Sequence, residues 1–237
     1  MATTVILSCE HGGNRIPKAY APLFASHAAL LESHRGYDAG ALQVARAMAR
    51  VTGAPLFAST VSRLLVDLNR SQGHPALFSR ITRELGKADR LRILHAYYVP
   101  HRGAVEESVA SAIRRRVAVL HLCVHSFTPE LDGVVRNADI GLLFDPRRPG
   151  EAAFCRRWRE VCQELAPELR VRFNYPYRGT SDGFTTYLRR RWSPQLYVGV
   201  ELEINQALVT ADPRRWAKVR RTLVDIFVRA AGRRRRG

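Results

Sequence analysis

The sequence predicts a three-layer α/β fold, in which an open mixed sheet carries helices on both faces. Short apolar runs alternate along the chain with segments of helical periodicity, which is the pattern of such folds. A length of 237 residues suits one large domain, and 46% hydrophobic residues are enough for its core. We expect a single domain over residues 1–231. The basic tail over 232–237 repeats arginine and is expected to be disordered.

Short apolar runs are the expected strands. They cover residues 4–9, 54–59, 117–124, 169–174 and 197–204. The most uniformly apolar of them are typical of strands that are covered on both faces, as in parallel or mixed sheets.

Three segments between or after these runs are expected to be helices. Their apolar or charged side chains recur with helical spacing over residues 39–51, 104–116 and 213–231. The long stretches 125–139 and 174–187 are rich in aromatic and charged residues. We expect them to be loops that form the walls of a site, because long loops in a compact domain are usually functional or disordered.

The net charge of +17 comes almost wholly from arginine, since the chain has only three lysines. Arginine with abundant alanine is typical of a GC-rich genome. Because no zinc-finger spacing and no basic motif interleaved with aromatic residues occurs, we expect no specific nucleic-acid partner. An arginine-rich nucleic-acid-binding protein remains a distant alternative, and weak attraction to polyanions at low salt is expected in either case.

The apolar runs and the cysteines bear on the protein's location. The longest uncharged apolar stretches have fewer than ten residues, too few to span a bilayer. No basic-then-apolar leader opens the sequence, so a cytoplasmic protein is expected. The four cysteines show no C-x-x-C spacing, and we interpret Cys9 and Cys123 as buried reduced thiols.

Chemically active side chains stand at the ends of three expected strands. The first strand is followed by Glu10 and His11, a later one by His125, and the last carries Glu201 and Glu203 on one face. Ligands of open α/β sheets bind beyond the carboxyl ends of the strands. Two histidines and a glutamate are therefore expected to meet at one rim of the sheet.

Two imidazoles and a carboxylate, with one position left open, are a common ligand set of catalytic zinc. Such a metal activates water, and a free carboxylate nearby serves as general base. A single histidine is more often structural, and we interpret His121, in mid-strand, in that way. Gly12 and Gly13 are expected to form a tight turn that lets backbone or substrate approach the metal. Ser126 lacks the G-x-S-x-G pattern of a serine nucleophile.

Arg63, Asp67 and Arg70 recur at spacings of four and three residues. On a helix they would share a face, but the alternation of apolar residues around them suits an extended segment equally well. They form either a surface salt bridge or an arginine that Asp67 holds toward a substrate carboxylate. The sequence favours neither interpretation.

Five blocks of the sequence together resemble the N-formylglutamate amidohydrolase family. They read SCEHGGNRIP, SRLLVDLNRS, VHSFTP, NYPYRGTSDG and GVELEINQ, and they run in the family's order from near residue 5 to near residue 206. The resemblance implies a phosphorylase/hydrolase-like α/β fold, akin to zinc-dependent exopeptidases. It also implies metal-assisted cleavage of the amide of an N-acyl amino acid, typically N-formyl-L-glutamate, in amino-acid catabolism. Another N-acyl amino acid or a small peptide stays an alternative substrate, because fold does not fix substrate.

The resemblance also implies roles for individual residues. His11 and His125 match metal-ligand positions, with a divalent ion such as zinc expected, and Glu203 matches the position of a general base. The expected substrate-binding residues are Arg63, Asn69, Arg70, Arg136, Tyr177 and Arg178.

The third metal ligand is open at this stage. Related exopeptidases use His-x-x-Glu, but the third residue after His11 is Asn14, which is a poor zinc ligand. Asp38, in the family-like block GYDAGA, is the first candidate. Glu10 is the second, because neighbouring residues of an extended chain point to opposite faces and Glu10 is therefore expected to point away.

Overall fold

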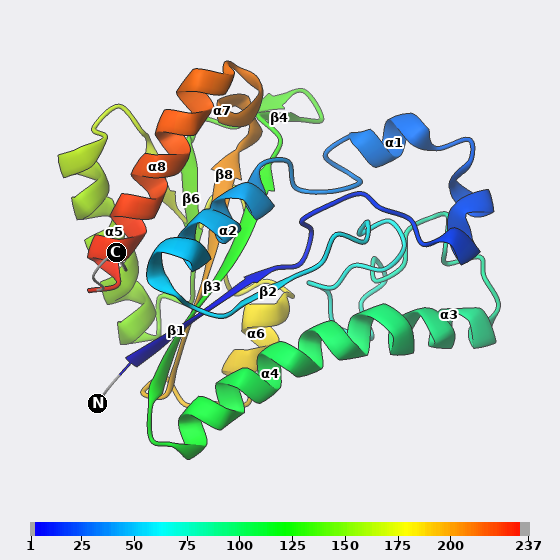
Figure 1. The fold of residues 1–237 in the computed structure, drawn as a ribbon, viewed down its shortest axis with the longest axis horizontal. Coiled ribbons are helices and arrows are strands. Elements are labelled where there is room, and N and C mark those ends of the chain that lie inside the picture. The colour runs from blue at the N-terminus through cyan, green and yellow to red at the C-terminus, as the bar shows by residue number, and fades with distance from the viewer. Residues whose placement is uncertain (1–2, 233–237) are drawn as a thin grey trace.

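A computed structural model describes residues 3–232 of the chain, so residues 233–237 of the expected basic tail lie outside the described part. Its centre is a six-stranded sheet in the order β2-β1-β3-β8-β6-β7 (Figure 1). The strands are β1 (Thr3–Cys9), β2 (Leu56–Ala58), β3 (Ala118–Phe127), β6 (Ile140–Leu143), β7 (Val171–Phe173) and β8 (Tyr197–Asn205). The first four in this order are parallel, and β6 runs antiparallel to β8. A small hairpin joins β4 (Glu130–Leu131) to β5 (Val134–Val135).

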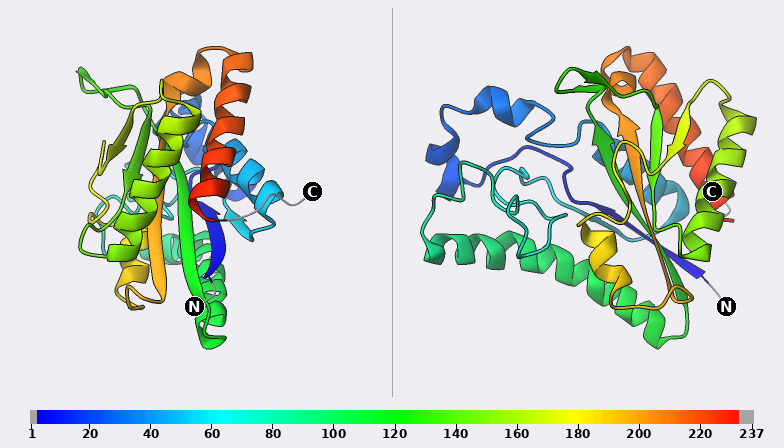
Figure 2. Two further views of the ribbon diagram at one scale, coloured as in Figure 1. Left: turned by 90° about the vertical axis from the view of Figure 1, so that its left-hand side faces the viewer. Right: turned by 180° about the vertical axis from the view of Figure 1, so that it is seen from behind.

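Helices cover both faces of the sheet, as the sequence predicts (Figure 2). One face packs against α2 (Ala41–Thr52), α5 (Pro149–Leu165) and α8 (Pro213–Ala230). The other packs against α4 (Val99–Arg114) and α6 (Phe184–Arg189). The remaining helices are η1 (Lys18–Phe24), α1 (Ala28–Glu32), α3 (Lys87–Ile93), η2 (Leu94–Tyr98) and α7 (Gln206–Thr210).

Several elements differ from the sequence-based expectation, among them β6, α5 and α6, which begins at Phe184 inside the expected loop over 174–187. The strand β6 follows directly on the expected loop over 125–139, and it has only four residues, too few for a clear pattern. Gly141 within it is required by packing, because a Cβ atom there would lie 2.0 Å from the carbonyl oxygen of Tyr175. The helix α5 was not predicted either, although Phe154, Trp158 and Val161 have helical spacing and are buried.

A second hydrophobic cluster lies beside the sheet, and we call it the side cluster. It consists of buried Phe24, Val61, Leu64, Leu65, Val66, Leu68, Leu77, Ile93 and Tyr98. It packs beneath the segments that contain η1 and α1, which stand off the carboxyl end of β1 (Figure 1). The sheet therefore supplies one side of the region beyond its strand ends, and the side cluster supplies the other.

Two expectations about the whole chain can be compared with the structure. Within residues 3–232, no helix is long and apolar enough to cross a bilayer. All four cysteines are buried and free, as predicted for Cys9 and Cys123.

Candidate metal centre and substrate cavity

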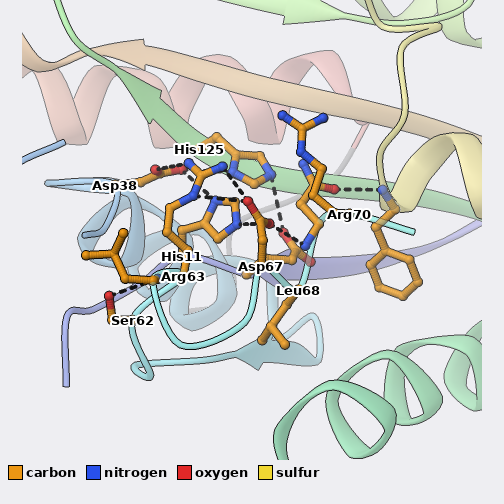
Figure 3. Close-up of polar contacts among 12 residues, drawn as sticks. His11, Asp38, Ser62, Arg63, Asp67, Leu68, Arg70 and His125 are labelled. Carbon is orange, nitrogen blue, oxygen red and sulfur yellow. Dashed lines mark hydrogen bonds and ion pairs between the residues drawn. The ribbon is translucent and has the colours of Figure 1, made fainter. Parts of the chain in front are cut away.

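Three buried side chains meet at the carboxyl edge of the sheet: His11, Asp38 and His125 (Figure 3). His11 follows β1, and His125 lies near the end of the neighbouring strand β3. Asp38 belongs to the connection before α2, and its backbone N–H donates to the carbonyl of His11 over 2.9 Å. A main-chain hydrogen bond therefore brings a carboxylate that is distant in sequence to the two histidines.

The geometry of this group fits a metal ion. Asp38 Oδ2 lies 2.9 Å from His125 Nδ1 and 3.4 Å from His11 Nδ1. Ligand atoms about 2 Å from a tetrahedral zinc ion lie roughly 3.3 Å from one another. Within the described chain, His11 Nδ1 is buried without a hydrogen-bond partner. Because buried polar atoms are normally satisfied, this nitrogen indicates a missing ligand.

Each histidine also has a carboxylate behind it. Asp67 Oδ1 lies 2.7 Å from His11 Nε2, and Glu10 Oε2 lies 3.3 Å from His125 Nε2. Carboxylates in such places orient metal-binding imidazoles and fix their tautomer. Both histidines therefore turn Nε2 toward a carboxylate and Nδ1 toward the shared centre.

The position of Glu10 corrects the expectation that it points away from the site. Ser8 pairs with Cys123 across β1 and β3, so Glu10, two residues on, is level with His125. His125 in turn pairs with Glu203 of β8. Glu10 and its neighbour His11 do point to opposite faces of the chain, as expected. The face on which Glu10 lies is, however, the face of the sheet on which it meets His125. It is fully buried there and is not among the three clustered groups.

His101, on α4, completes the surroundings of Glu10. Its Nε2 lies 3.5 Å from Glu10 Oε1. Burial opposes the charge of Glu10, but the two histidines outweigh it and hold the pKa of this carboxyl well below its usual range. Burial alone would lower the pKa of His125, but its hydrogen bond to Asp38 and its ion pair with Glu10 outweigh burial and raise that pKa well above the ordinary value.

Glu203 has a different environment. It lies in the wall of the cavity beside the three clustered groups, and its Oε2 atom is buried without a hydrogen-bond partner in the described chain. Burial raises the pKa of Glu203 to about 8. The negative charges of Asp38 and Glu201 add to this increase, and His125 partly opposes it. A carboxylate with a pKa near neutrality can both accept and return a proton.

The segment that carries Arg63 and Asp67 is neither a helix nor a strand around these residues. The Arg63 guanidinium forms a 2.7 Å ion pair with Asp67 Oδ2, while Asp67 Oδ1 is occupied by His11. Burial opposes the charge of Asp67, but Arg63 and His11 hold the pKa of this carboxyl well below its usual range. Asp67 therefore supports the His11 ring and at the same time anchors the Arg63 guanidinium.

A cavity of about 740 Å³ opens beside the centre. Its wall contains five of the six expected substrate-binding residues, namely Arg63, Asn69, Arg70, Tyr177 and Arg178. Arg136 is not in that wall. Its guanidinium donates to the Tyr177 hydroxyl over 3.0 Å and stacks on that ring. Arg136 therefore lies behind the cavity wall, against the rings of Tyr177 and Phe127, which both line the cavity.

Sequence reasoning gave His101 and Arg102 no role. Arg102 donates to the carbonyls of Leu68 and Arg70 and lies over three aromatic rings, 4.1 Å from the centre of the Phe184 ring. It thereby supports the segment that follows Asp67. The helical spacing of adjacent residues on α4 could not reveal these partners, because they are distant in sequence.

Other sequence interpretations have clear outcomes. His121 is structural, since its ring bonds the hydroxyls of Ser8 and Tyr197 inside the sheet. Asn14 is not near the centre and donates to Glu32 at the surface. Gly12 and Gly13 make room for the close approach of the neighbouring backbone. A Cβ atom on Gly12 would lie 2.9 Å from the carbonyl oxygen of Ser59, and one on Gly13 would lie 2.8 Å from that of Thr60.

Fold and site together define an α/β protein with a buried His–Asp–His group at the mouth of a cavity, a set that can hold a metal ion. The family model for N-formylglutamate amidohydrolase matches residues 3–210. The chain belongs to that family and is a hydrolase that acts on amides.

Solved structures show the same fold. The chain is 30% identical to a gene product from Agrobacterium tumefaciens, with a TM-score of 0.81, and the match covers 96% of this chain and 90% of that one. It is 22% identical to N-formylglutamate amidohydrolase from Ralstonia eutropha, with a TM-score of 0.74 and coverage of 98% and 93%. A search of proteins with curated functions found no match.

Proposed function

We propose that this protein is a metal-dependent amidohydrolase that cleaves the amide of an N-acyl acidic amino acid such as N-formyl-L-glutamate. The observation that carries the proposal is the buried Nδ1 of His11, which has no hydrogen-bond partner in the described chain and shares one centre with Asp38 and His125 beside a large cavity. Membership of the N-formylglutamate amidohydrolase family supports the reaction class.

His11, Asp38 and His125 would hold one divalent ion, and two imidazoles with a carboxylate favour zinc. Such an ion, when bound, supplies a Lewis acid that polarises a carbonyl and lowers the pKa of water. Asp67 and Glu10 keep the two imidazoles turned so that both Nδ1 atoms face the centre.

Glu203 is our candidate for the general base. It lines the cavity, pairs with His125 across the strands, and has a free buried oxygen. In the proposed reaction, Glu203 takes a proton from the attacking water and returns it to the nitrogen of the departing amino acid. The carbonyl carbon gains the hydroxyl and loses the amine, which gives a carboxylic acid and a free amino acid.

Arginines in the cavity wall favour an anionic substrate. Arg70 and Arg178 both line the cavity, and Arg63 is fixed by Asp67. A guanidinium that is held in place binds a carboxylate with two parallel hydrogen bonds. We propose that these arginines bind the substrate carboxylates.

The proposal is tested by assaying N-formyl-, N-acetyl- and N-succinyl-L-glutamate with metal-free protein to which Zn²⁺, Co²⁺ or Mn²⁺ is added back. We expect glutamate release that requires the added ion and that His125→Ala abolishes. Absence of hydrolysis of every N-acyl amino acid, with the protein folded and metal-loaded, would refute the proposal. We also expect the protein to act in the cytoplasm, which fractionation of the source cells tests.

A further inference from the structure

The cavity is larger than N-formylglutamate requires. At about 30 Å³ for each of its roughly 12 non-hydrogen atoms, the room of a water molecule in the liquid, this substrate fills at most about 360 Å³. The cavity measures about 740 Å³, a size typical of sites for larger organic ligands. About half of the space beside the centre is therefore not accounted for by the smallest substrate.

The additional space has an apolar wall. Leu30 of α1, together with Phe78 and Ile81, lines the cavity, and each of the three is half-buried. All three pack against the side cluster and not against the sheet that carries His11 and His125. Rigid support beneath a partly exposed apolar wall is typical of a binding subsite, because covering such a wall with ligand removes apolar surface from water.

Two exposed arginines line the same cavity as this apolar wall. They are Arg35 and Arg80, and the described chain gives neither guanidinium an ion-pair partner. Asp182, which also lines the cavity, is occupied by the hydroxyl and backbone N–H of Ser71. The wall therefore combines apolar side chains with unpaired positive charge.

From this arrangement we infer that the substrate is an N-acyl amino acid that carries, besides its carboxylate, an apolar group of aromatic size seated against Leu30, Phe78 and Ile81. The inference rests on the proposed reaction, the cleavage of an N-acyl amino acid at this same site, and extends its substrate class beyond acidic amino acids. The apolar group belongs either to the acyl part or to the amino-acid side chain, and the choice of substrates distinguishes these two positions.

The test compares kcat/KM for N-formyl-L-glutamate, N-formyl-L-phenylalanine and N-phenylacetyl-L-glutamate with metal-loaded protein. We expect at least one of the aromatic substrates to exceed N-formyl-L-glutamate by about 10-fold or more, the selectivity that an apolar pocket supplies. Phe78→Ala and Ile81→Ala should each remove most of that advantage and leave kcat/KM for N-formyl-L-glutamate nearly unchanged.

Leu85→Ala is the matched control, because Leu85 packs against the side cluster without lining the cavity. It should preserve the preference for the aromatic substrate, and circular dichroism confirms that each variant is folded. The inference is overturned if N-formyl-L-glutamate is the best of the three substrates, or if Phe78→Ala and Ile81→Ala lower all rates equally. Failure of the proposed function gives a different result, since none of the three substrates would then be hydrolysed.

Discussion

Asp67 lies between Arg63 and His11, with Oδ2 2.7 Å from the guanidinium and Oδ1 2.7 Å from the imidazole Nε2. One carboxylate thus orients a candidate metal ligand and anchors a cavity arginine. This double contact fixes the irregular segment around Asp67 beside the centre. Tyr98 and Arg102 hold the same segment further along the chain, because both donate hydrogen bonds to the carbonyl of Arg70.

Asp67→Asn is expected to weaken metal binding by about 10- to 100-fold, because the amide orients the His11 ring less well and does not support its basicity. Competition with a chromogenic chelator measures the affinity. Asp145→Asn is the control, since Asp145 pairs with Arg147 away from the cavity and should not affect the affinity. Equal affinities of Asp67→Asn and wild type would contradict the role assigned to Asp67.

Glu10→Gln is expected to weaken metal binding by a similar factor of about 10 or more, through His125 instead of His11. The variant keeps the volume of the buried side chain, so the fold should survive. A metal titration of the folded variant checks the prediction. If Glu10 were only a packing residue, the affinity would equal that of the wild type.

Glu203→Gln is expected to lower kcat by about 10²- to 10⁴-fold, the range for loss of a general base. Metal content should stay unchanged, because Glu203 is not one of the three clustered groups. Glu201→Gln is the matched control two residues earlier on the same strand, where the carboxylate already accepts from Thr185 over 2.6 Å. The assignment would be wrong if Glu201→Gln cost more activity than Glu203→Gln.

Burial lowers the pKa of His121 to about 4 in the folded protein. Unfolding exposes the ring, whose pKa returns to about 6.5. Between these values only the unfolded state binds the proton, so stability is full above about pH 6.5 and falls as the pH is lowered toward 4. The 2.5-unit difference corresponds to roughly 3 kcal/mol. Urea unfolding of wild type and His121→Asn should show a smaller loss between these pH values for the variant, and equal losses would contradict the prediction.

Arg102→Met keeps an unbranched apolar stem but removes the guanidinium, with its hydrogen bonds to the carbonyls of Leu68 and Arg70 and its stacking on three aromatic rings. We expect the free energy of unfolding to fall by about 2 kcal/mol, the contribution of hydrogen bonds from a charged group. Urea denaturation measures it. Arg92→Met, at an exposed position on α3, is the control and should change stability by less than about 0.5 kcal/mol.

The sequence was sufficient to predict the parts of the site that depend on strand ends. Apolar runs located β1, β3 and β8, and the rule that ligands bind beyond their carboxyl ends brought His11, His125 and Glu203 together. The family resemblance added Asp38. These steps need only local patterns and parallel strands.

The supporting residues could not be predicted, because they depend on register and on packing between distant segments. Alternation correctly turned Glu10 away from His11, but only the pairing of Ser8 with Cys123 shows that it then meets His125. His101, 91 residues later in the chain, reaches Glu10 from a helix. Asp67 looked like a partner of Arg63 alone, since no local pattern links residue 67 to residue 11.

The central claim is that His11, Asp38 and His125 hold one divalent ion that the hydrolysis requires. Elemental analysis of protein purified without chelator, together with the rate of amide cleavage, tests it most directly. We predict about one metal ion per chain in the wild type, and loss of both metal and activity in Asp38→Ala and His125→Ala. Full activity of chelator-treated, metal-free protein, or undiminished metal content in both variants, would contradict the account.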